Sequence, residues 1–171
     1  MRVSKYCSKL PVSRLVERTR NTGTKNVHVN YTNYQILEKL PYEVTTYKSV
    51  DNAMNQDDAV NYPVEFLNSM EPPGMPPYCL NLKVGSSIIL LRNVNAPKLC
   101  NGTRLAVKKL MTNLVEATIL TGKAKGEIVL MPRIPLIKTD MTFEFKRLQF
   151  PVRLAFAMSV NKADKLFKYS D

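Results

Sequence analysis

The side chains best suited to binding chemistry in this sequence are basic residues that alternate with aromatic ones in its second half. Lys108 and Lys109 stand at the end of an expected strand, and Lys123 and Lys125 stand on an expected turn. Basic side chains neutralise phosphates, and aromatic rings stack on the bases of single strands. The same pattern continues with Lys146, Arg147 and Arg153, which surround Phe143, Phe145 and Phe150.

Two interpretations of this pattern stay open from the residues alone. In one, the basic groups contact a nucleic-acid backbone and the rings stack on bases. In the other, the rings fill a β-barrel core and the lysines only solubilise the surface. For the lysines, we favour contact with phosphate.

No complete catalytic constellation is recognisable. The sequence contains no GxxxxGK[ST] phosphate loop, no GxGxxG and no GxSxG. The single histidine, His28, excludes HExxH and any multi-histidine metal site. The acidic and Asn-rich stretch from Asp51 to Asn61 is interpreted as a solvent-exposed loop rather than as a pair of catalytic carboxylates. We therefore expect no cofactor or metal to bind this chain alone.

Charge divides the sequence into three parts. The 171 residues carry 25 Lys and Arg against 14 Asp and Glu, a net charge of +11. Residues 1–40 carry +6, residues 41–78 carry −5 and residues 79–171 carry +10. A strongly basic second half favours a polyanionic partner such as nucleic acid or an anionic membrane face. The alternative is a charged surface that only aids solubility.

Cellular location follows from what the sequence lacks. No stretch of 18 apolar residues could form a transmembrane helix, and no apolar run follows the basic N-terminus as in a secretory signal. The odd cysteines, Cys7, Cys79 and Cys100, include no CxxC, so neither a disulfide scaffold nor a zinc finger is favoured. A reducing compartment is expected.

Apolar spacing predicts a β-rich middle between mixed flanks. A basic arm with a short helix at 12–20 is expected first, then alternation over 27–31 and a helix over 34–40. A strand at 43–47, a short helix at 62–68 and a rigid proline-rich linker at 71–77 follow. Strands are expected at 80–84, 88–91, 103–110, 114–120 and 127–131, and helical spacing starts at Pro151.

Three sequence boxes carry a family resemblance: Phe-Leu-Asn followed by Pro-Gly-Met-Pro-Pro, then Leu-Cys-Asn-Gly-Thr-Arg, then Gln-Phe-Pro-Val. The stretch from Tyr62 to Val107 closely resembles the C-terminal half of the PIF-type (petite integration frequency) DNA helicases, especially the Helitron-like branch. The resemblance continues over 117–136 and 145–163, and NVHVNYTNYQILEKLP (26–41) looks like the family segment after the fourth motif.

The resemblance implies an α+β, β-rich fold: an SH3-like small β-barrel inserted in an incomplete RecA-like α/β domain. Its expected divisions are a basic arm (1–25), part of the second RecA-like domain with the linker (26–79), the barrel (80–140), a return to the RecA-like domain (141–163) and a tail foreign to the family (164–171).

By the same resemblance, the function is that of an ATP-dependent 5′–3′ DNA helicase, acting in repair, recombination, telomere maintenance or transposition. Single-stranded DNA is the implied partner, ATP and Mg²⁺ are the cofactors of the full-length family, and the nucleus is the expected location, with the mitochondrion as the alternative. Ser159, Asn161 and Lys162 match the fifth motif, near DNA and nucleotide. Charge and position add Arg104, Lys108, Lys109, Lys146 and Arg147 as DNA contacts.

The departures from the family pattern are as informative as the matches. The Walker A and Walker B boxes, the first RecA-like domain and the sixth motif are not found, and Asp164-Lys165-Leu166 replaces the Gln-Gly step. The chain is therefore expected to be a helicase fragment that does not hydrolyse ATP alone. The alternatives are a non-catalytic nucleic-acid-binding or protein-binding module and a non-functional transposon relic.

Overall fold

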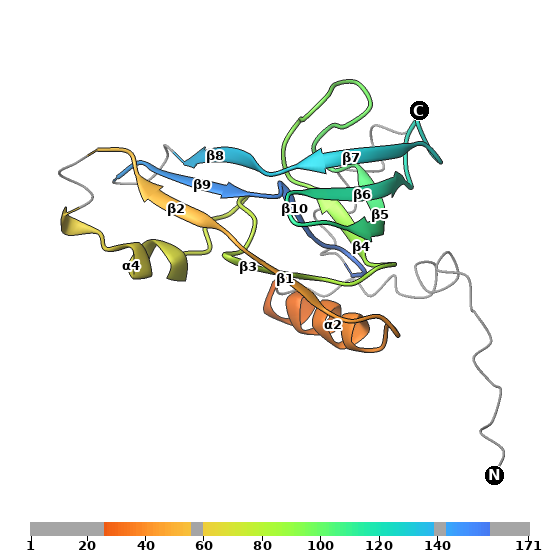
Figure 1. The fold of residues 1–171 in the computed structure, drawn as a ribbon, viewed down its shortest axis with the longest axis horizontal. Helices are drawn as coiled ribbons and strands as arrows, with labels where there is room; N and C mark the ends of the chain where they lie inside the picture. Colours follow the sequence, from red (N-terminus) through yellow and green to blue (C-terminus); the bar gives the residue numbers. More distant parts are fainter. Residues whose placement is uncertain (1–25, 56–59, 139–142, 158–171) are drawn as a thin grey trace, which may run out of the picture.

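The computed structural model describes residues 26–55, 60–138 and 143–157, which form a β-rich α+β fold (Figure 1). The predicted fold class is confirmed. The basic arm and the C-terminal tail lie outside the described residues. The elements, in chain order, are α2 (Asn26–Glu38), β1 (Thr45–Lys48), β2 (Val50–Ala53), α4 (Val64–Ser69), β3 (Cys79–Leu82), β4 (Ser87–Leu90), β5 (Arg104–Leu110), β6 (Leu114–Ile119), β7 (Ile128–Pro132), β8 (Ile134–Lys138), β9 (Phe145–Gln149) and β10 (Val152–Leu154).

All strand pairs in the described part are antiparallel and build three sheets. The largest has the order β10-β4-β5-β6-β7, the second β2-β9-β8, and the third pairs β1 with β3. Among the described residues no pairing joins β7 to β10, so hydrogen bonds do not close the large sheet into a barrel. Strand pairs connect residues on either side of the expected boundaries at 80 and 140: β1 pairs with β3, β8 pairs with β9, and β4 pairs with β10.

The main core lies on one face of the five-stranded sheet. Its fully buried side chains alternate along the strands, as in β6, where Val115, Ala117 and Ile119 point inward. Aliphatic side chains from β3, β4, β5 and β10 complete it, and Phe150 meets Tyr47 edge to face with ring centres 4.9 Å apart. This alternation is the pattern from which the strands were predicted.

Three expectations for the flanks are wrong. Residues 27–31 belong to α2 and not to a strand. The expected acidic loop starts with β2, where Asp51 is buried beside Arg147. The helical spacing after Pro151 instead begins with β10, because Val152 and Leu154 pair with β4. In each case a tertiary partner overrides the local pattern.

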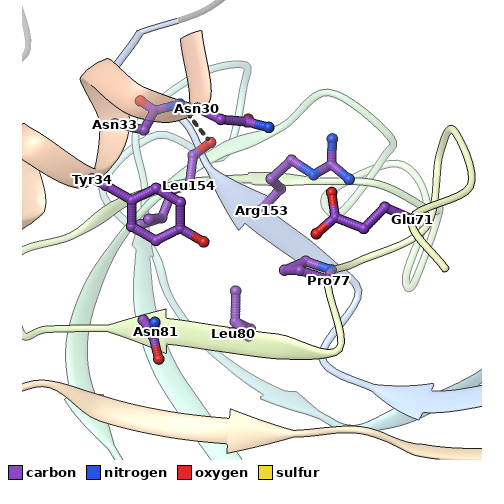
Figure 2. Close-up of a pocket in the computed structure, with 9 residues that line it drawn as sticks. All are labelled: Asn30, Asn33, Tyr34, Glu71, Pro77, Leu80, Asn81, Arg153 and Leu154. Carbon is purple, nitrogen blue, oxygen red and sulfur yellow. Dashed lines mark hydrogen bonds between the residues drawn. The ribbon is translucent and has the colours of Figure 1, made fainter. Parts of the chain in front are cut away.

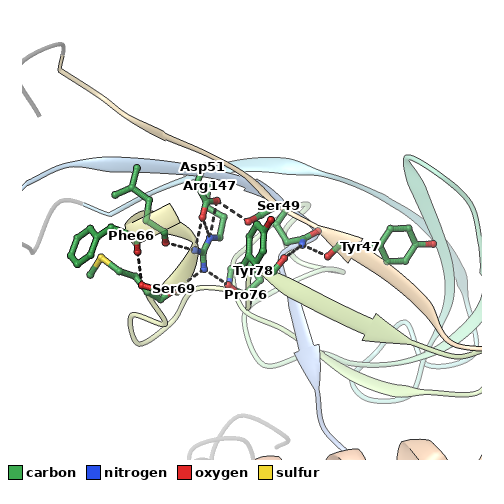
Figure 3. A network of polar contacts seen from close by, with 11 residues as sticks. Tyr47, Ser49, Asp51, Phe66, Ser69, Pro76, Tyr78 and Arg147 are labelled. Atoms are coloured by element: carbon green, nitrogen blue, oxygen red, sulfur yellow. Dashed lines mark hydrogen bonds and ion pairs between the residues drawn. The ribbon is translucent and has the colours of Figure 1, made fainter. Parts of the chain in front are cut away.

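A buried ion pair joins the three-stranded sheet to α4 and the proline-rich segment, residues 71–77 (Figure 3). The Arg147 and Asp51 side chains are both fully buried, and Nη2 of Arg147 lies 2.6 Å from Oδ2 of Asp51. Nε also donates to the carboxylate, and the remaining N–H groups reach the carbonyls of Leu67, Met70 and Pro76 at 3.0–3.1 Å. All five guanidinium donors are thereby satisfied.

Neighbouring polar side chains extend this network. The Ser49 hydroxyl donates to Oδ1 of Asp51 at 2.8 Å. The amide of buried Gln149 donates to the carbonyls of Tyr47 and Tyr78 and accepts from the backbone N–H of Phe150. Side chains of β9 therefore hold the residues up to Tyr78 in place, although this stretch has no regular secondary structure.

Replacing Asp51 by Ala should leave the guanidinium of Arg147 buried without its counter-ion. We expect a loss of about 3–5 kcal/mol in the free energy of unfolding, measured by urea denaturation. The matched control is Asn52→Ala, an exposed neighbour on the same strand, which should change stability by less than about 0.5 kcal/mol. Equal, small effects of the two substitutions would contradict this role for the ion pair.

Candidate nucleic-acid interface

The first pair of predicted DNA contacts, Lys108 and Lys109, lies at a β-bulge. The register of β5 against β6 shifts between Val107 and Lys109. A bulge breaks the alternation of inward and outward side chains. As a result both consecutive lysines are exposed, and two positive charges stand side by side on the surface.

The second pair, Lys123 and Lys125, is exposed on the turn that joins β6 to β7. Gly122 and Gly126 flank the pair with φ of 84° and 91°, a backbone conformation that L side chains rarely adopt. Lys109 lies opposite Glu116, in the middle of β6, and the turn with Lys123 and Lys125 begins after Ile119 at the end of that strand. The two lysine pairs are therefore separated by roughly 10 Å of strand, at about 3.3 Å per residue, plus part of the turn.

Arg104, another predicted DNA contact, makes hydrogen bonds within the chain. It is half-buried, and Nη2 donates to the carbonyl of Ala155 at 3.2 Å and the hydroxyl of Ser87 at 3.4 Å. Burial lowers the pKa of its guanidinium. This side chain joins β5 to the segment after β10, and its contact with DNA stays a prediction.

The expectation for Arg147 is corrected by its burial, because a guanidinium with every donor satisfied inside the protein is not available to phosphate. Lys146 alternates with it and is partly exposed on the other face of β9. Phe143, Phe145 and Phe150 are buried, so the aromatic rings fill the core and do not stack on bases. Of the two interpretations of the rings, the core is confirmed.

Ser159, Asn161 and Lys162 lie outside the described residues, but the chain just before them is fixed. Buried Asn33 of α2 accepts from the backbone N–H of Ala157 at 2.7 Å and donates to the carbonyl of Ala157 at 3.2 Å. Its amide also reaches the carbonyl of Leu154 at 3.4 Å. Nothing local in the sequence signals this tether.

Arg133 was not singled out from the sequence. Its guanidinium carbon lies 5.5 Å from the ring centre of Tyr47 and 5.4 Å from that of Phe150, in the range of cation–π contacts, and Nη1 donates to the carbonyl of Lys48. The Tyr47 hydroxyl donates to the carbonyl of Met111. These contacts hold β1 against the five-stranded sheet, so Arg133 has a structural role.

A small cavity of about 30 Å³ lies between α2, β3 and β10 (Figure 2). Asn30, Tyr34, Glu71, Asn81 and Arg153 supply its polar groups. Burial, and then the nearby carboxylate of Glu71, raises the pKa of Tyr34, so its hydroxyl stays protonated at neutral pH. Such a volume has room for about two waters.

Neither a metal site nor a membrane span is found in the described part of the chain. No three His, Cys, Asp or Glu side chains there gather as metal ligands. No helix in the same residues has the length and apolar character to cross a membrane.

Comparison with known proteins relates this arrangement to helicases. Residues 65–110 match the family model of the 2B domain of the DNA helicase Pif1. The Pif1 helicase of Candida albicans has a similar fold, with a TM-score of 0.61 and 20% identity over 89% of this chain and 40% of that one. Unliganded Pif1 from Bacteroides sp. has a TM-score of 0.59 and 19% identity over 84% of this chain and 42% of that one. Bacteroides Pif1 bound to single-stranded DNA has a TM-score of 0.60 and 19% identity over 89% of this chain and 35% of that one. No curated protein matches the sequence.

The expected resemblance to the PIF-type helicases is confirmed: residues 65–110 match the model of the Pif1 2B domain, and the described part of the chain has a fold similar to that of a region of Pif1 helicases. The chain covers 35–42% of the length of those solved helicases. The Helitron-like branch stays a prediction.

Replacing Asn33 by Ala should release the chain that leads toward the fifth-motif residues. The backbone amide of Ala157 loses its acceptor, so its hydrogen exchange should become at least about tenfold faster, for a local cost of about 1–3 kcal/mol. Gln35→Ala, on the exposed side of α2, is the control and should leave that exchange rate unchanged. Unchanged exchange in the Asn33 variant would show that the tether is not formed in solution.

Proposed function

We propose that this chain is part of an ATP-dependent 5′–3′ DNA helicase of the PIF type and that it supplies contacts to single-stranded DNA. The observation that carries the proposal is the exposed pair Lys108 and Lys109, which lies inside the region that matches the Pif1 2B domain. The net charge of +10 over residues 79–171 supports the same partner. A solved neighbour of the same fold, Bacteroides Pif1, is bound to single-stranded DNA.

We propose that ATP hydrolysis depends on other parts of a longer helicase. ATP hydrolysis needs a phosphate-binding lysine, a Mg²⁺-binding hydroxyl and an acidic residue, which the family carries in its first RecA-like domain. The sequence contains no phosphate-binding loop of that kind. Bacteroides Pif1 has been solved in complex with ADP-AlF3 and single-stranded DNA, which supports ATP and Mg²⁺ as the cofactors of the whole enzyme. We therefore propose that this chain binds DNA but is not competent for hydrolysis alone.

The two lysine pairs are proposed to act as a phosphate track with little sequence preference. Phosphate contacts position a strand without reading its bases. The strands β5, β6 and β7 contain no aromatic residue, and the exposed rings of Tyr31, Tyr34 and Tyr42 lie on or just after α2. Arg104, Lys146, Ser159, Asn161 and Lys162 are proposed as further contacts in the assembled enzyme.

The proposed phosphate track is tested by measuring the binding of a labelled oligo(dT) to this chain with fluorescence anisotropy. If three to five phosphates are neutralised, log K should fall with log salt with a slope of about −2 to −3.5 between 50 and 200 mM salt. Lys108→Ala/Lys109→Ala should weaken binding and reduce the slope by about 1.4, since each phosphate contact on a single strand contributes about 0.7.

The control is Lys98→Ala, because Lys98 already forms an ion pair with Glu127 at 2.8 Å. It should change the slope by less than either lysine of the bulge. Absence of binding at low salt, or binding that ignores salt, would overturn the DNA track.

A further inference from the structure

The outer face of the five-stranded sheet, which is turned away from the main core, is unevenly charged over its strands β5, β6 and β7. These three strands lie side by side (Figure 1). Arg104, Lys108 and Lys109 are the basic residues of β5, whereas β6 and β7 contain no Lys, Arg or His. Positive charge in this part of the sheet therefore follows one strand and does not spread across three.

The register shows which side chains of β5 share the outer face. Ala106 lies opposite Thr118, and Lys109 lies opposite Glu116 after the bulge. Thr118 and Glu116 alternate along β6 with side chains of the main core, so they and their partners point away from that core. Arg104, two residues before Ala106, is on the same face. Arg104, Ala106 and Lys109 thus form a row about 16 Å long, at about 3.3 Å per residue.

Arg104 lies between the two lysine pairs. Its backbone N–H donates to the hydroxyl of Thr121 at 3.1 Å, and its carbonyl accepts from the N–H of Leu120 at 2.8 Å. The turn that carries Lys123 and Lys125 therefore begins beside Arg104. The guanidinium is held at one end, because Nη2 donates within the chain whereas Nη1 makes no hydrogen bond with the described residues. Nη1 is thus available to a phosphate.

The neighbouring strands β6 and β7 offer no group that attracts phosphate. The Glu116 carboxylate borders the row, since directly opposite residues such as Lys109 and Glu116 have Cβ atoms about 4.5–5.5 Å apart. Beyond it on β7, Ile128 and Leu130 are apolar and more than half exposed. Phosphates laid across β6 and β7 would meet a carboxylate and apolar side chains, whereas phosphates along β5 meet a cation at each end of the row.

We propose that single-stranded DNA lies along the outer face of β5, from Lys109 over Ala106 to Arg104 and on to the turn at 120–127, and that Glu116 keeps it off β6 and β7. The small side chain of Ala106 lets the DNA backbone approach the sheet between the two cations. The path rests on the proposed DNA contact of Lys108 and Lys109. It adds the course of the strand, a place for Arg104 within it, and a limit set by a carboxylate.

A lysine added at either of two points on one row across the sheet tests this path. Ala106 lies opposite Thr118, which lies opposite Ile128, so Ala106→Lys and Ile128→Lys place the same charge on the same face two strands apart, roughly 9–10 Å. In anisotropy titrations with labelled oligo(dT), Ala106→Lys should tighten binding about threefold and steepen the slope of log K against log salt by about 0.7. Ile128→Lys should change that slope by less than about 0.2, because salt screens a charge outside the path.

Glu116→Gln is an independent test that keeps the shape of the side chain. It should tighten oligo(dT) binding about twofold by removing a repulsion, whereas the control Glu65→Gln on α4 should leave the affinity unchanged. Circular dichroism checks that each variant is folded, and Glu116→Gln decides if Ala106→Lys is not.

The outcomes separate the path from the DNA contact on which it rests. Equal effects of the two added lysines, a larger effect at Ile128, or no change in Glu116→Gln would overturn the path while the unaltered chain still binds oligo(dT). If the unaltered chain does not bind oligo(dT), the proposed DNA contact fails, and the path is overturned with it.

Discussion

The ion pair between Asp51 and Arg147 is the interaction on which the arrangement of this chain depends. A guanidinium without its partners inside a protein is strongly destabilising, so its five donors require that β2, the C-terminal end of α4 and the proline-rich segment all meet β9. Residues 71–77 contain no helix or strand, yet Met75 and Pro76 are buried there. Without Arg147, the carbonyls of Leu67, Met70 and Pro76 would lose the side chain that joins them to β9, and only the side chains of Gln149 and Arg153 would still donate to this part of the chain, at Tyr78 and Met75.

Much of the β-rich middle was predictable, because alternation of apolar residues is a local property. The strands around Leu80–Leu82 and Leu114–Ile119 follow directly from it. The strand at Ile88–Leu90 follows from a continuous apolar run, and the short helix that includes Phe66 follows from Pro63 at its first turn. The flanks were not predictable in this way. Asp51 in an acidic, Asn-rich stretch is typical of a loop, and Arg147 among basic residues is typical of a surface. Only the pairing of β2 with β9, across nearly a hundred residues, makes both of them core.

The same limit applies to the candidate site. Lys108 and Lys109 were predicted as surface contacts and are exposed, although the bulge that exposes both of them is visible only in the register. Arg104 and Arg147 have the same charge but donate hydrogen bonds within the chain. The sequence shows how many basic residues there are but not where they point, whereas the structure places Lys108, Lys109, Lys123 and Lys125 on the surface and Arg147 in the core.

Mapping of oligo(dT) onto the backbone amides of the ¹⁵N-labelled chain by NMR tests most directly whether the exposed lysines form a DNA contact. The account predicts salt-sensitive shifts that concentrate on Lys108, Lys109, Lys123, Lys125 and their strand neighbours, while the amides of Glu65 and Phe66 in α4 stay unchanged. Shifts that centre on α4, or shifts spread evenly over the molecule, would contradict it.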